Sequence, residues 1–402
     1  MSDIISHKMA RRGVFCYFLC RGHIYFNMQL AKQKIKEFFA CLIMAFSVLG
    51  CVLGAGFLSG AEIYSFFVRF GYYGVVGAIV CASLFGFIVY AVTSKRVTGN
   101  LANLSMQASG VKNGESKIMQ ICGLVIAGTM VAGTNNIIIG FGCNAWLSNI
   151  LVFLCLYVAL VLGLKFAKAV NICVTAVSLV FVIAIVNSSF INHYFADGVV
   201  LNVNFANCFL AIIFAVSYAC MNAISSYTIL SGLSVEGKGN ESVSWVRRRC
   251  RSIGIWCGVI LATLILIIYS ALVAVNAKGQ MPLVGLINNG FVKVMYCSLL
   301  VVAMLSTMFS CGLGGQKLFI QKWGKGYSCL VVSLLCQVIS FAGFGNLVSI
   351  GYPLIGAIVA AKFVINFFAN RKSKAKRQKN AAKPHKLALV DVQNAKSDAE
   401  KL

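Results

Sequence analysis

The chain has 402 residues, of which 59% are hydrophobic and 11% are charged, and its net charge is +25. Charged residues make up about a quarter of an ordinary soluble domain, so this composition excludes a soluble globular protein. Apolar stretches of about 20 residues recur along the chain, and each is long enough to cross a bilayer as a helix. The sequence therefore predicts an all-α polytopic membrane protein.

The positive charge and the cysteines have ordinary explanations in such a protein. Basic residues gather in every second loop, which indicates membrane topology rather than a nucleic-acid partner. Most of the 17 cysteines are scattered singly through the spans, and the four histidines lie outside them. We therefore predict neither structural zinc nor a disulfide framework, and we interpret the cysteines as small packing residues.

Ten membrane spans are predicted from the apolar runs. They cover approximately residues 38–67, 73–92, 118–142, 149–164, 169–187, 207–230, 254–275, 291–320, 327–342 and 346–369. Lys and Arg are concentrated before the first span and in the loops 93–117, 165–168, 231–253 and 317–326, whereas the opposite side has only Arg69, Lys278 and Lys293. This alternation predicts a multi-pass protein of the inner or plasma membrane with both termini in the cytoplasm.

Polar segments flank the membrane domain. The division predicts a basic N-terminal segment over 1–36, a membrane domain over 37–369 and a polybasic tail over 370–402. The first 27 residues lack the order of a signal peptide, so either translation begins at Met28 or these residues form an arm on the inner face. We expect the tail to rest on anionic lipid head groups rather than on nucleic acid.

The first span contains the glycine-rich segment Gly50-Cys-Val-Leu-Gly-Ala-Gly56. Each glycine destabilises a helix by about 1 kcal/mol relative to alanine. Non-helical backbone at membrane depth is tolerated only inside protein or beside a water-filled cavity. A broken first helix is therefore typical of the binding sites of secondary transporters. The alternative is that the glycines only permit close helix packing.

Glu62 is the only acidic residue that we place inside a span. A buried carboxylate costs a few kcal/mol unless it is paired or protonated. At about 1.5 Å per residue it lies about 9 Å beyond Gly56 along the outer half-helix, with Ser59 and Phe66 on the same face. We interpret Glu62 and Ser59 as coupling or gating residues. Glu62 would be a proton carrier, a contact for a substrate amine or part of an outer gate; the structural alternative is a lock between helix 1 and a neighbour.

The sixth span is interrupted at its middle by small and polar residues within the segment Phe214–Tyr227. It comes five spans after the glycine-rich one, and corresponding breaks in two halves of a chain indicate inverted repeats. We therefore predict breaks at mid-membrane in helices 1 and 6, and two inverted five-helix repeats over 37–190 and 205–369.

Two adjacent hydroxyls, Ser306 and Thr307, lie at the middle of the eighth span. A hard cation such as sodium takes oxygen ligands, and hydroxyls with the free carbonyls of an unwound helix supply them without net charge. The alternative is that both hydroxyls bond to carbonyls of their own helix.

One block of the sequence carries a family resemblance: Gly54-Ala-Gly-Phe-Leu-Ser-Gly-Ala-Glu-Ile63, followed by Phe66-Phe-Val-Arg-Phe-Gly71 and Gly74-Val-Val-Gly77. It resembles the YkvI-like membrane proteins, within the amino acid–polyamine–organocation (APC) superfamily of transporters that share the leucine-transporter (LeuT) fold. Beyond this block the resemblance is one of topology, over residues 38–369.

The resemblance implies a site for one sodium ion. Its oxygens would come from the carbonyls of Gly50, Leu53 and Ala303 and from the hydroxyls of Ser306 and Thr307. In some proton-coupled relatives a lysine on helix 5 replaces this ion, and the fifth span here has none.

The resemblance also implies a substrate site at the helix 1 break, where free amides would meet a substrate carboxylate. Helix 6 would lie beside the substrate body, and helix 3 offers further polar side chains. The implied substrate-binding residues are Gly54, Ala55, Gly56, Phe57, Ser217, Ala219 and Met221, and the helix 3 candidates are Thr129, Thr134, Asn135 and Asn136.

Together these features predict a secondary active transporter of a small amino acid or related amine that works by alternating access. Sodium coupling is preferred to proton coupling, and antiport stays open. A passive channel is disfavoured because no filter segment or ring of pore charges occurs. An enzyme is disfavoured because the spans contain neither paired carboxylates nor histidine. A membrane sensor on the same fold is the remaining alternative.

Overall fold

The structure is a computed structural model, and it describes residues 29, 31–102, 113–192, 205–232, 243–274, 281–285, 287, 289–362 and 365. The predictions for the first 28 residues and for the polybasic tail lie outside the described residues, as do residues 103–112 and 233–242 of the basic loops. The chain divides into two units, Met1–Gly356 and Ala357–Leu402, and the sites described below lie within the first.

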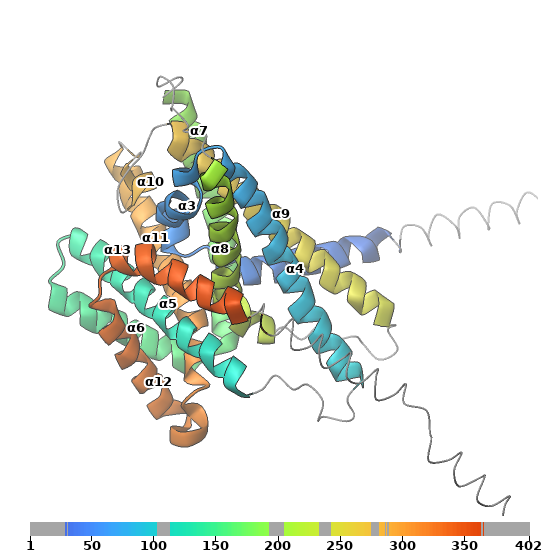
Figure 1. The fold of residues 1–402 in the computed structure, drawn as a ribbon. Helices are drawn as coiled ribbons and strands as arrows, with labels where there is room; N and C mark the ends of the chain where they lie inside the picture. The colour runs from blue at the N-terminus through green and yellow to red at the C-terminus, as the bar shows by residue number, and fades with distance from the viewer. Residues whose placement is uncertain are drawn as a thin grey trace, which may run out of the picture. The chain divides into compact units, whose positions relative to one another are not determined.

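All secondary structure in the described residues is helical (Figure 1). A helix over 31–49 comes first, and another runs from 352 to 362. The long helices between them are α4 (Tyr73–Ala102), α5 (Asn113–Gly140), α6 (Ala145–Leu162), α7 (Leu164–Asn192), α8 (Phe205–Gly232), α9 (Val243–Ala274), α11 (Gly290–Gln316) and α12 (Ile320–Ser340). The short elements are α2 (Ala55–Leu58), α3 (Ala61–Phe66), η1 (Val68–Phe70), α10 (Pro282–Gly285), α13 (Phe344–Asn346) and the π-helical η2 (Leu347–Gly351).

Within the described residues, eight helices are long and apolar enough to cross a membrane, and they match eight of the ten predicted spans. One of the other two is the first span, which the structure divides into several pieces. The other is the ninth, α12, whose first turns carry Lys322 and Lys325. The chain is therefore a multi-pass helical membrane protein.

The break in helix 1 is as predicted. The helix over 31–49 is followed by a non-helical stretch from 50 to 54 and then by α2. A second interruption follows at Gly60, whose φ of 81° places it in the left-handed region. Glycine adopts this conformation at little cost, so the chain turns sharply between α2 and α3.

The predicted break in helix 6 is wrong, because α8 is one continuous helix over Phe205–Gly232. Its central segment contains neither glycine nor proline. Its polar side chains bond to their own helix: Asn222 Nδ2 donates to Tyr218 O at 3.1 Å, and Ser225 Oγ contacts Met221 O at 3.4 Å. Such back-bonding satisfies polar side chains without unwinding the backbone.

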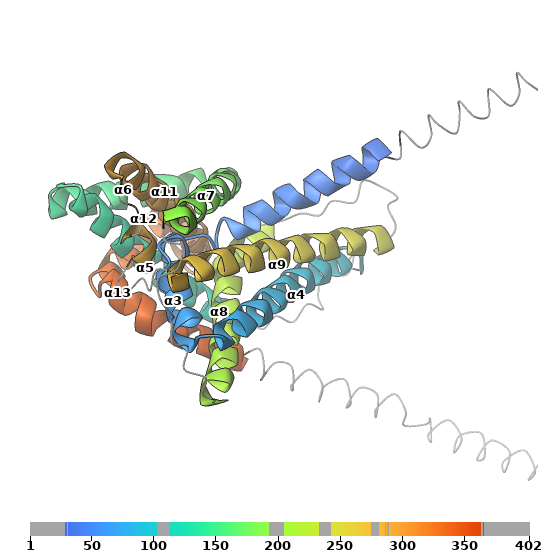
Figure 2. The ribbon, with the colours of Figure 1, turned by 90° about the horizontal axis from the view of Figure 1, so that it is seen from above.

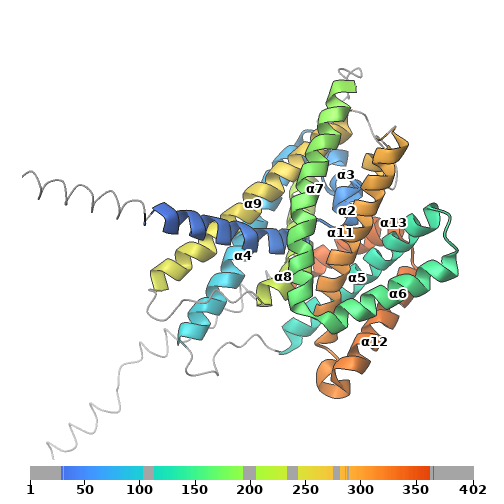
Figure 3. The ribbon, with the colours of Figure 1, turned by 180° about the vertical axis from the view of Figure 1, so that it is seen from behind.

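Close pairing of helices builds the bundle around helix 1. α4 lies along α9 (Figures 1 and 2), and α11 contacts α5, α7 and α8 (Figure 3). The two pieces beyond the break separate, since α2 packs on α11 whereas α3 packs on α8 and α9. The broken helix therefore connects the elements that carry the predicted site residues.

Candidate functional site

The end of the helix over 31–49 is held by polar side chains of three other helices. Several carbonyls at a helix end lack partners within the helix, so side chains of other helices can donate to them. The donor and carbonyl pairs are Thr175 Oγ1 to Phe46 O at 2.8 Å, Asn171 Nδ2 to Ser47 O at 3.2 Å, Ser226 Oγ to Val48 O at 3.4 Å, Ser306 Oγ to Gly50 O at 3.0 Å and Thr307 Oγ1 to Cys51 O at 3.2 Å.

Three of the five predicted sodium ligands, Gly50, Ala303 and Ser306, meet at this junction, whereas Thr307 bonds to Cys51 O. The Ser306 hydroxyl lies within hydrogen-bond distance of both Gly50 O and Ala303 O, the latter at 2.9 Å. Leu53 is buried in the same break, and Thr307 Oγ1 lies only 3.0 Å from the place where a Cβ on Gly54 would be. Both hydroxyls thus face helix 1, Ser306 also bonds to its own helix, and uncharged oxygens of the kind that sodium accepts gather here.

Asn171 of α7 is a residue of this junction that sequence reasoning missed. Its Nδ2 also lies 3.0 Å from Cys51 Sγ and 3.1 Å from Ser310 Oγ, while its Oδ1 is buried without a hydrogen-bond partner. The backbone of Asn171 packs directly on Gly50, where a Cβ would lie 2.4 Å from the Asn171 carbonyl oxygen. An amide inside the apolar fifth span was the available signal, because a polar group there needs partners.

Glu62 reaches back to the break instead of extending away from it. Its side chain is 3% exposed, and its Oε2 accepts a hydrogen bond of 2.7 Å from the Tyr218 hydroxyl of α8. Its Oε1 lies 2.1 Å from the place that a Cβ on Gly56 would occupy. The separation of Gly56 and Glu62 expected along a straight half-helix is therefore wrong. The left-handed turn at Gly60 reverses the chain between them.

Ser59 belongs to that turn. Its hydroxyl contacts Gly56 O at 3.3 Å and the Ala61 N–H at 3.4 Å, and its carbonyl accepts from the Leu283 N–H at 2.9 Å. We expected Ser59 to share a helix face with Glu62 because we assumed continuous helical spacing, but the turn interrupts that spacing. Phe66 remains on the continuous helix α3 with Glu62, and its ring centroid lies 4.7 Å from that of Tyr218.

Comparisons with known proteins identify the fold to which this geometry belongs. No family model matches the chain. The chain is 23% identical over 339 residues to the uncharacterized membrane protein YkvI of Bacillus subtilis (strain 168), which covers 79% of this chain and 92% of that protein.

Solved structures of transporters are similar over most of the chain. MhsT in complex with L-phenylalanine matches with a TM-score of 0.52 and 14% identity over 80% of this chain and 88% of that one. The inward-facing conformation of Mhp1 matches with a TM-score of 0.50 and 14% identity, over 79% and 72%. A manganese transporter of Eremococcus coleocola, bound to an aromatic bis-isothiourea compound, matches with a TM-score of 0.50 and 14% identity, over 79% and 77%.

The chain has the LeuT-type fold. The predicted fold class is thereby confirmed, and the similarity to YkvI agrees with the resemblance carried by the Gly54–Ile63 block. Within this LeuT-type fold, the first helix is broken as expected and the sixth is not.

The unbroken sixth helix changes which of its residues face the break. Ser217 Oγ donates to Pro353 O at 3.0 Å, so it is directed toward the last helix. Tyr218, which sequence reasoning missed, faces Glu62 instead. Ala219 and Met221 are buried in the bundle, as is Phe57 of α2. A phenol in an apolar span requires a hydrogen-bond partner, and this requirement was the available signal for Tyr218.

The polar residues of α5, which is helix 3 of the LeuT-type fold, lie in two separate places. Thr134 Oγ1 lies 3.3 Å from Met304 Sδ, and Gly54 packs beside Met130. Asn135 instead bonds to Ser148 at 2.8 Å and to Asn149 at 2.6 Å, and Asn136 is exposed. The second group joins α5 to α6 and lies apart from the helix 1 break.

Tyr352 is a further buried phenol. It follows the π-helical turn η2 directly, and such turns are frequent at functional sites. Its ring is 1% exposed, and its hydroxyl has no hydrogen-bond partner among the described residues. The preceding turn η2 packs on α3, the helix that carries Glu62. Tyr352 thus follows an element that packs on α3.

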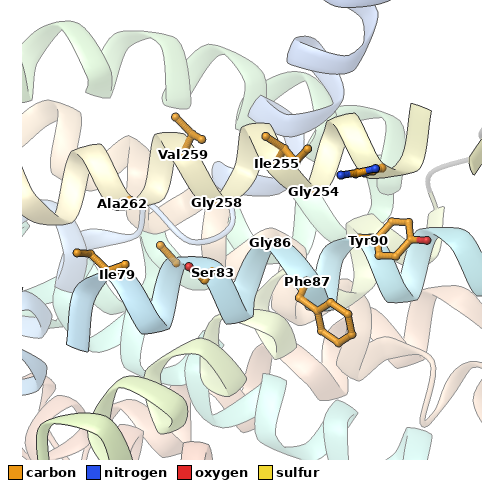
Figure 4. Close-up of a pocket in the computed structure, with 12 residues that line it drawn as sticks. Ile79, Ser83, Gly86, Phe87, Tyr90, Gly254, Ile255, Gly258, Val259 and Ala262 are labelled. Atoms are coloured by element: carbon orange, nitrogen blue, oxygen red, sulfur yellow. The ribbon is translucent and has the colours of Figure 1, made fainter. Parts of the chain in front are cut away.

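A separate apolar groove of about 610 Å³ lies between α4 and α9 (Figure 4). None of the predicted site residues lines it. Within the described residues, no group of three or more His, Cys, Asp or Glu side chains could hold a metal ion. The candidate site is therefore the helix 1 break, with the oxygen junction on one side and the Glu62–Tyr218 pair on the other.

Proposed function

We propose that the chain is a secondary active transporter of a small amino acid or related amine in the inner or plasma membrane. The observation that carries the proposal is the break in helix 1, where carbonyls of a membrane helix meet the side chains of α7, α8 and α11. The LeuT-type fold supports it, since MhsT with that fold is bound to L-phenylalanine. Both termini would face the cytoplasm, and the basic segments would contact anionic lipid head groups.

Coupling to sodium is supported by the oxygens at the junction. One sodium ion would be held by the carbonyls of Gly50, Leu53 and Ala303 and by the hydroxyls of Ser306 and Thr307. The Ser306 and Thr307 hydroxyls donate to Gly50 O and Cys51 O. Ion binding would replace those bonds by coordination and so link helix 1 to α11 in a second arrangement, which alternating access requires.

The test is uptake into liposomes that contain the purified full-length chain. A labelled pool of amino acids and amines is supplied, and sodium and proton gradients are imposed separately. We expect accumulation driven by the sodium gradient. Accumulation under the proton gradient alone would move coupling to Glu62, and no accumulation of any compound under either gradient would refute the proposed transport.

The sodium site is tested with Ser306→Ala and Thr307→Val, which remove the hydroxyls but keep buried side chains of similar shape. We expect the sodium concentration for half-maximal uptake to rise at least about tenfold, because each lost ligand to a cation costs on the order of 1–3 kcal/mol. Ser298→Ala is the matched control, since that hydroxyl lies on the same helix, is exposed and bonds to Val294 O. Equal sodium dependence in all three variants would refute the site.

A further inference from the structure

The protein places a carboxylate of its own at the helix 1 break. Glu62 Oε1 lies where a Cβ on Gly56 would be, so the side chain occupies the space beside that glycine. The family resemblance led us to expect a substrate carboxylate at Gly56 and its neighbours. A second carboxylate brought there would meet Glu62 at contact distance, and like charges repel strongly where the surroundings exclude water.

The Glu62 carboxylate has no basic partner among the described residues. It accepts a hydrogen bond from the Tyr218 hydroxyl, which is uncharged, and it forms no ion pair within the described residues. Arg69 comes from the next turn of the chain but lies over the rings of Phe214 and Phe70, at 4.0 and 4.7 Å from their centroids. The ionised form of an acid buried here is costly without a cation, so a cationic ligand would stabilise it.

The surroundings favour an organic cation over a metal ion. The Tyr218 ring packs on Phe66 and, edge to face at 5.4 Å, on Phe67, so the phenol that bonds to the carboxylate belongs to an aromatic cluster. Aromatic faces attract ammonium groups, whereas a hard metal ion needs several charged or carbonyl oxygens.

We propose that the substrate is an organic ammonium ion without a free carboxylate and that Glu62 is its counter-ion. This inference rests on the proposed transport function and narrows it to amines. The ammonium group would lie beside Glu62, and the apolar body of the substrate would pack on the aromatic side chains of α3 and α8.

The experiment compares matched pairs of probes that differ only in the carboxylate: 2-phenylethylamine with L-phenylalanine, and 3-methylbutylamine with L-leucine. Binding to the purified full-length chain is measured from the shift in Tm with ligand concentration, which needs no transport. We expect each amine to bind at least about tenfold more tightly than its amino acid. Equal or tighter binding of the amino acids, or binding of neither amine, would overturn the inference.

Two variants distinguish the counter-ion role of Glu62 from the other roles considered for it. Glu62→Gln keeps the shape and removes the charge, so amine affinity should fall by more than about 30-fold. Glu62→Gly empties the space at Gly56, so the preference should reverse toward the amino acid of each pair. Glu37→Gln, which neutralises an acid in the helix over 31–49, is the control and should bind as the wild type does.

The rival roles predict different results. A proton carrier would leave the amine affinity of Glu62→Gln unchanged while gradient-driven uptake is lost. A structural lock would lower the Tm and the affinity for both members of each pair together, with no reversal in Glu62→Gly. Either result would overturn the inference.

Failure of the inference and failure of the proposed transport are distinguishable. Accumulation of amino acids in liposomes without preference for amines would overturn the inference and leave transport standing. Amine binding without accumulation under any gradient would refute transport and keep the ammonium site.

Discussion

At the residue scale, Gly50 and Gly56 show how the same added methyl group would meet very different neighbours. A Cβ on Gly50 would lie 2.4 and 2.6 Å from the carbonyl oxygen and Cα of Asn171, which are backbone atoms of α7. A Cβ on Gly56 would meet the Oε1 of Glu62, at the far end of a flexible side chain. Backbone atoms in a packed bundle cannot move aside, whereas a carboxylate can rotate away.

We therefore expect Gly50→Ala to damage folding. Overpacking in a well-packed core costs about 1–3 kcal/mol, and more where the neighbour is backbone. The measurement is the yield of monodisperse protein and its Tm in detergent. A variant with wild-type Tm would show that helix 1 does not approach α7 as closely as described.

Gly56→Ala should instead fold and lose function. The displaced Glu62 carboxylate would leave Tyr218, and a misplacement of about 1 Å at a site can lower activity about 100-fold. Uptake per folded molecule is the readout, with Tm as the check on folding. Gly140→Ala is the control, because no atom lies within 4 Å of its added Cβ. Wild-type uptake in Gly56→Ala would contradict the placement of Glu62.

At the scale of elements, the turn between α2 and α3 decides where Glu62 points. Gly60 has a φ of 81°, and an added Cβ would also lie 3.1 Å from Leu283 of α10. Tyr296 of α11 donates a hydrogen bond to Leu58 O and so fixes the end of α2 before the turn. The orientation of a functional side chain thus depends on one glycine and two neighbouring elements.

Gly60→Ala should lower the free energy of unfolding by about 1–2 kcal/mol, the cost of the left-handed conformation for an L-residue. The decrease is read from a denaturant or thermal melt of the purified protein. Gly60→Asn should recover part of the loss, because asparagine tolerates this conformation better than alanine does. Equal stability of all three proteins would refute the left-handed turn.

The pair α4 and α9 depends on small residues in the same way that many membrane helices do. A Cβ on Gly254 would lie 2.6 Å from Gly86 O, whereas a Cβ on Gly258 would lie 3.1 Å from Ala82 O. We expect Gly254→Ala to lower Tm clearly and Gly258→Ala to lower it less, since the first contact must separate the backbones. The reverse order of the two Tm values would contradict this packing.

At the scale of the whole molecule, the break connects parts of the bundle that transport would move relative to each other. α2 packs on α11, α3 packs on α8 and α9, and the carbonyls before the break are bonded to α7, α8 and α11. A ligand at the break therefore contacts several helices at once. Its binding energy can favour one arrangement of them over another.

Hydrogen exchange should report this connection. Sodium together with 2-phenylethylamine should slow amide exchange across residues 50–62 and across 303–310 of α11, because a bound ligand suppresses local opening. Residues 150–158 of α6, which contain none of the predicted site residues, are the internal control and should be unchanged. Uniform protection of all helices would indicate general stabilisation rather than a site at the break.

Composition and local pattern were sufficient to predict several features of this protein. The recurrent apolar runs predicted a multi-pass helical membrane protein, and the glycines from 50 to 56 predicted the break in helix 1. Both follow from local physics, because a bilayer demands satisfied backbone and glycine weakens a helix wherever it occurs. The family resemblance also predicted that Gly50, Ala303 and Ser306 lie together, as they do in the structure.

Only the tertiary structure decided the remaining features, because they depend on contacts between distant segments. The polar residues of helix 6 suggested a break, yet bonds within α8 satisfy them and the helix continues. Glu62 was expected beyond Gly56, but the turn at Gly60 returns it to the break and to Tyr218, 156 positions away in the chain. The place of Asn171 in the junction could not be predicted for the same reason. Its partners lie on helix 1 and α11, and no local pattern indicates them.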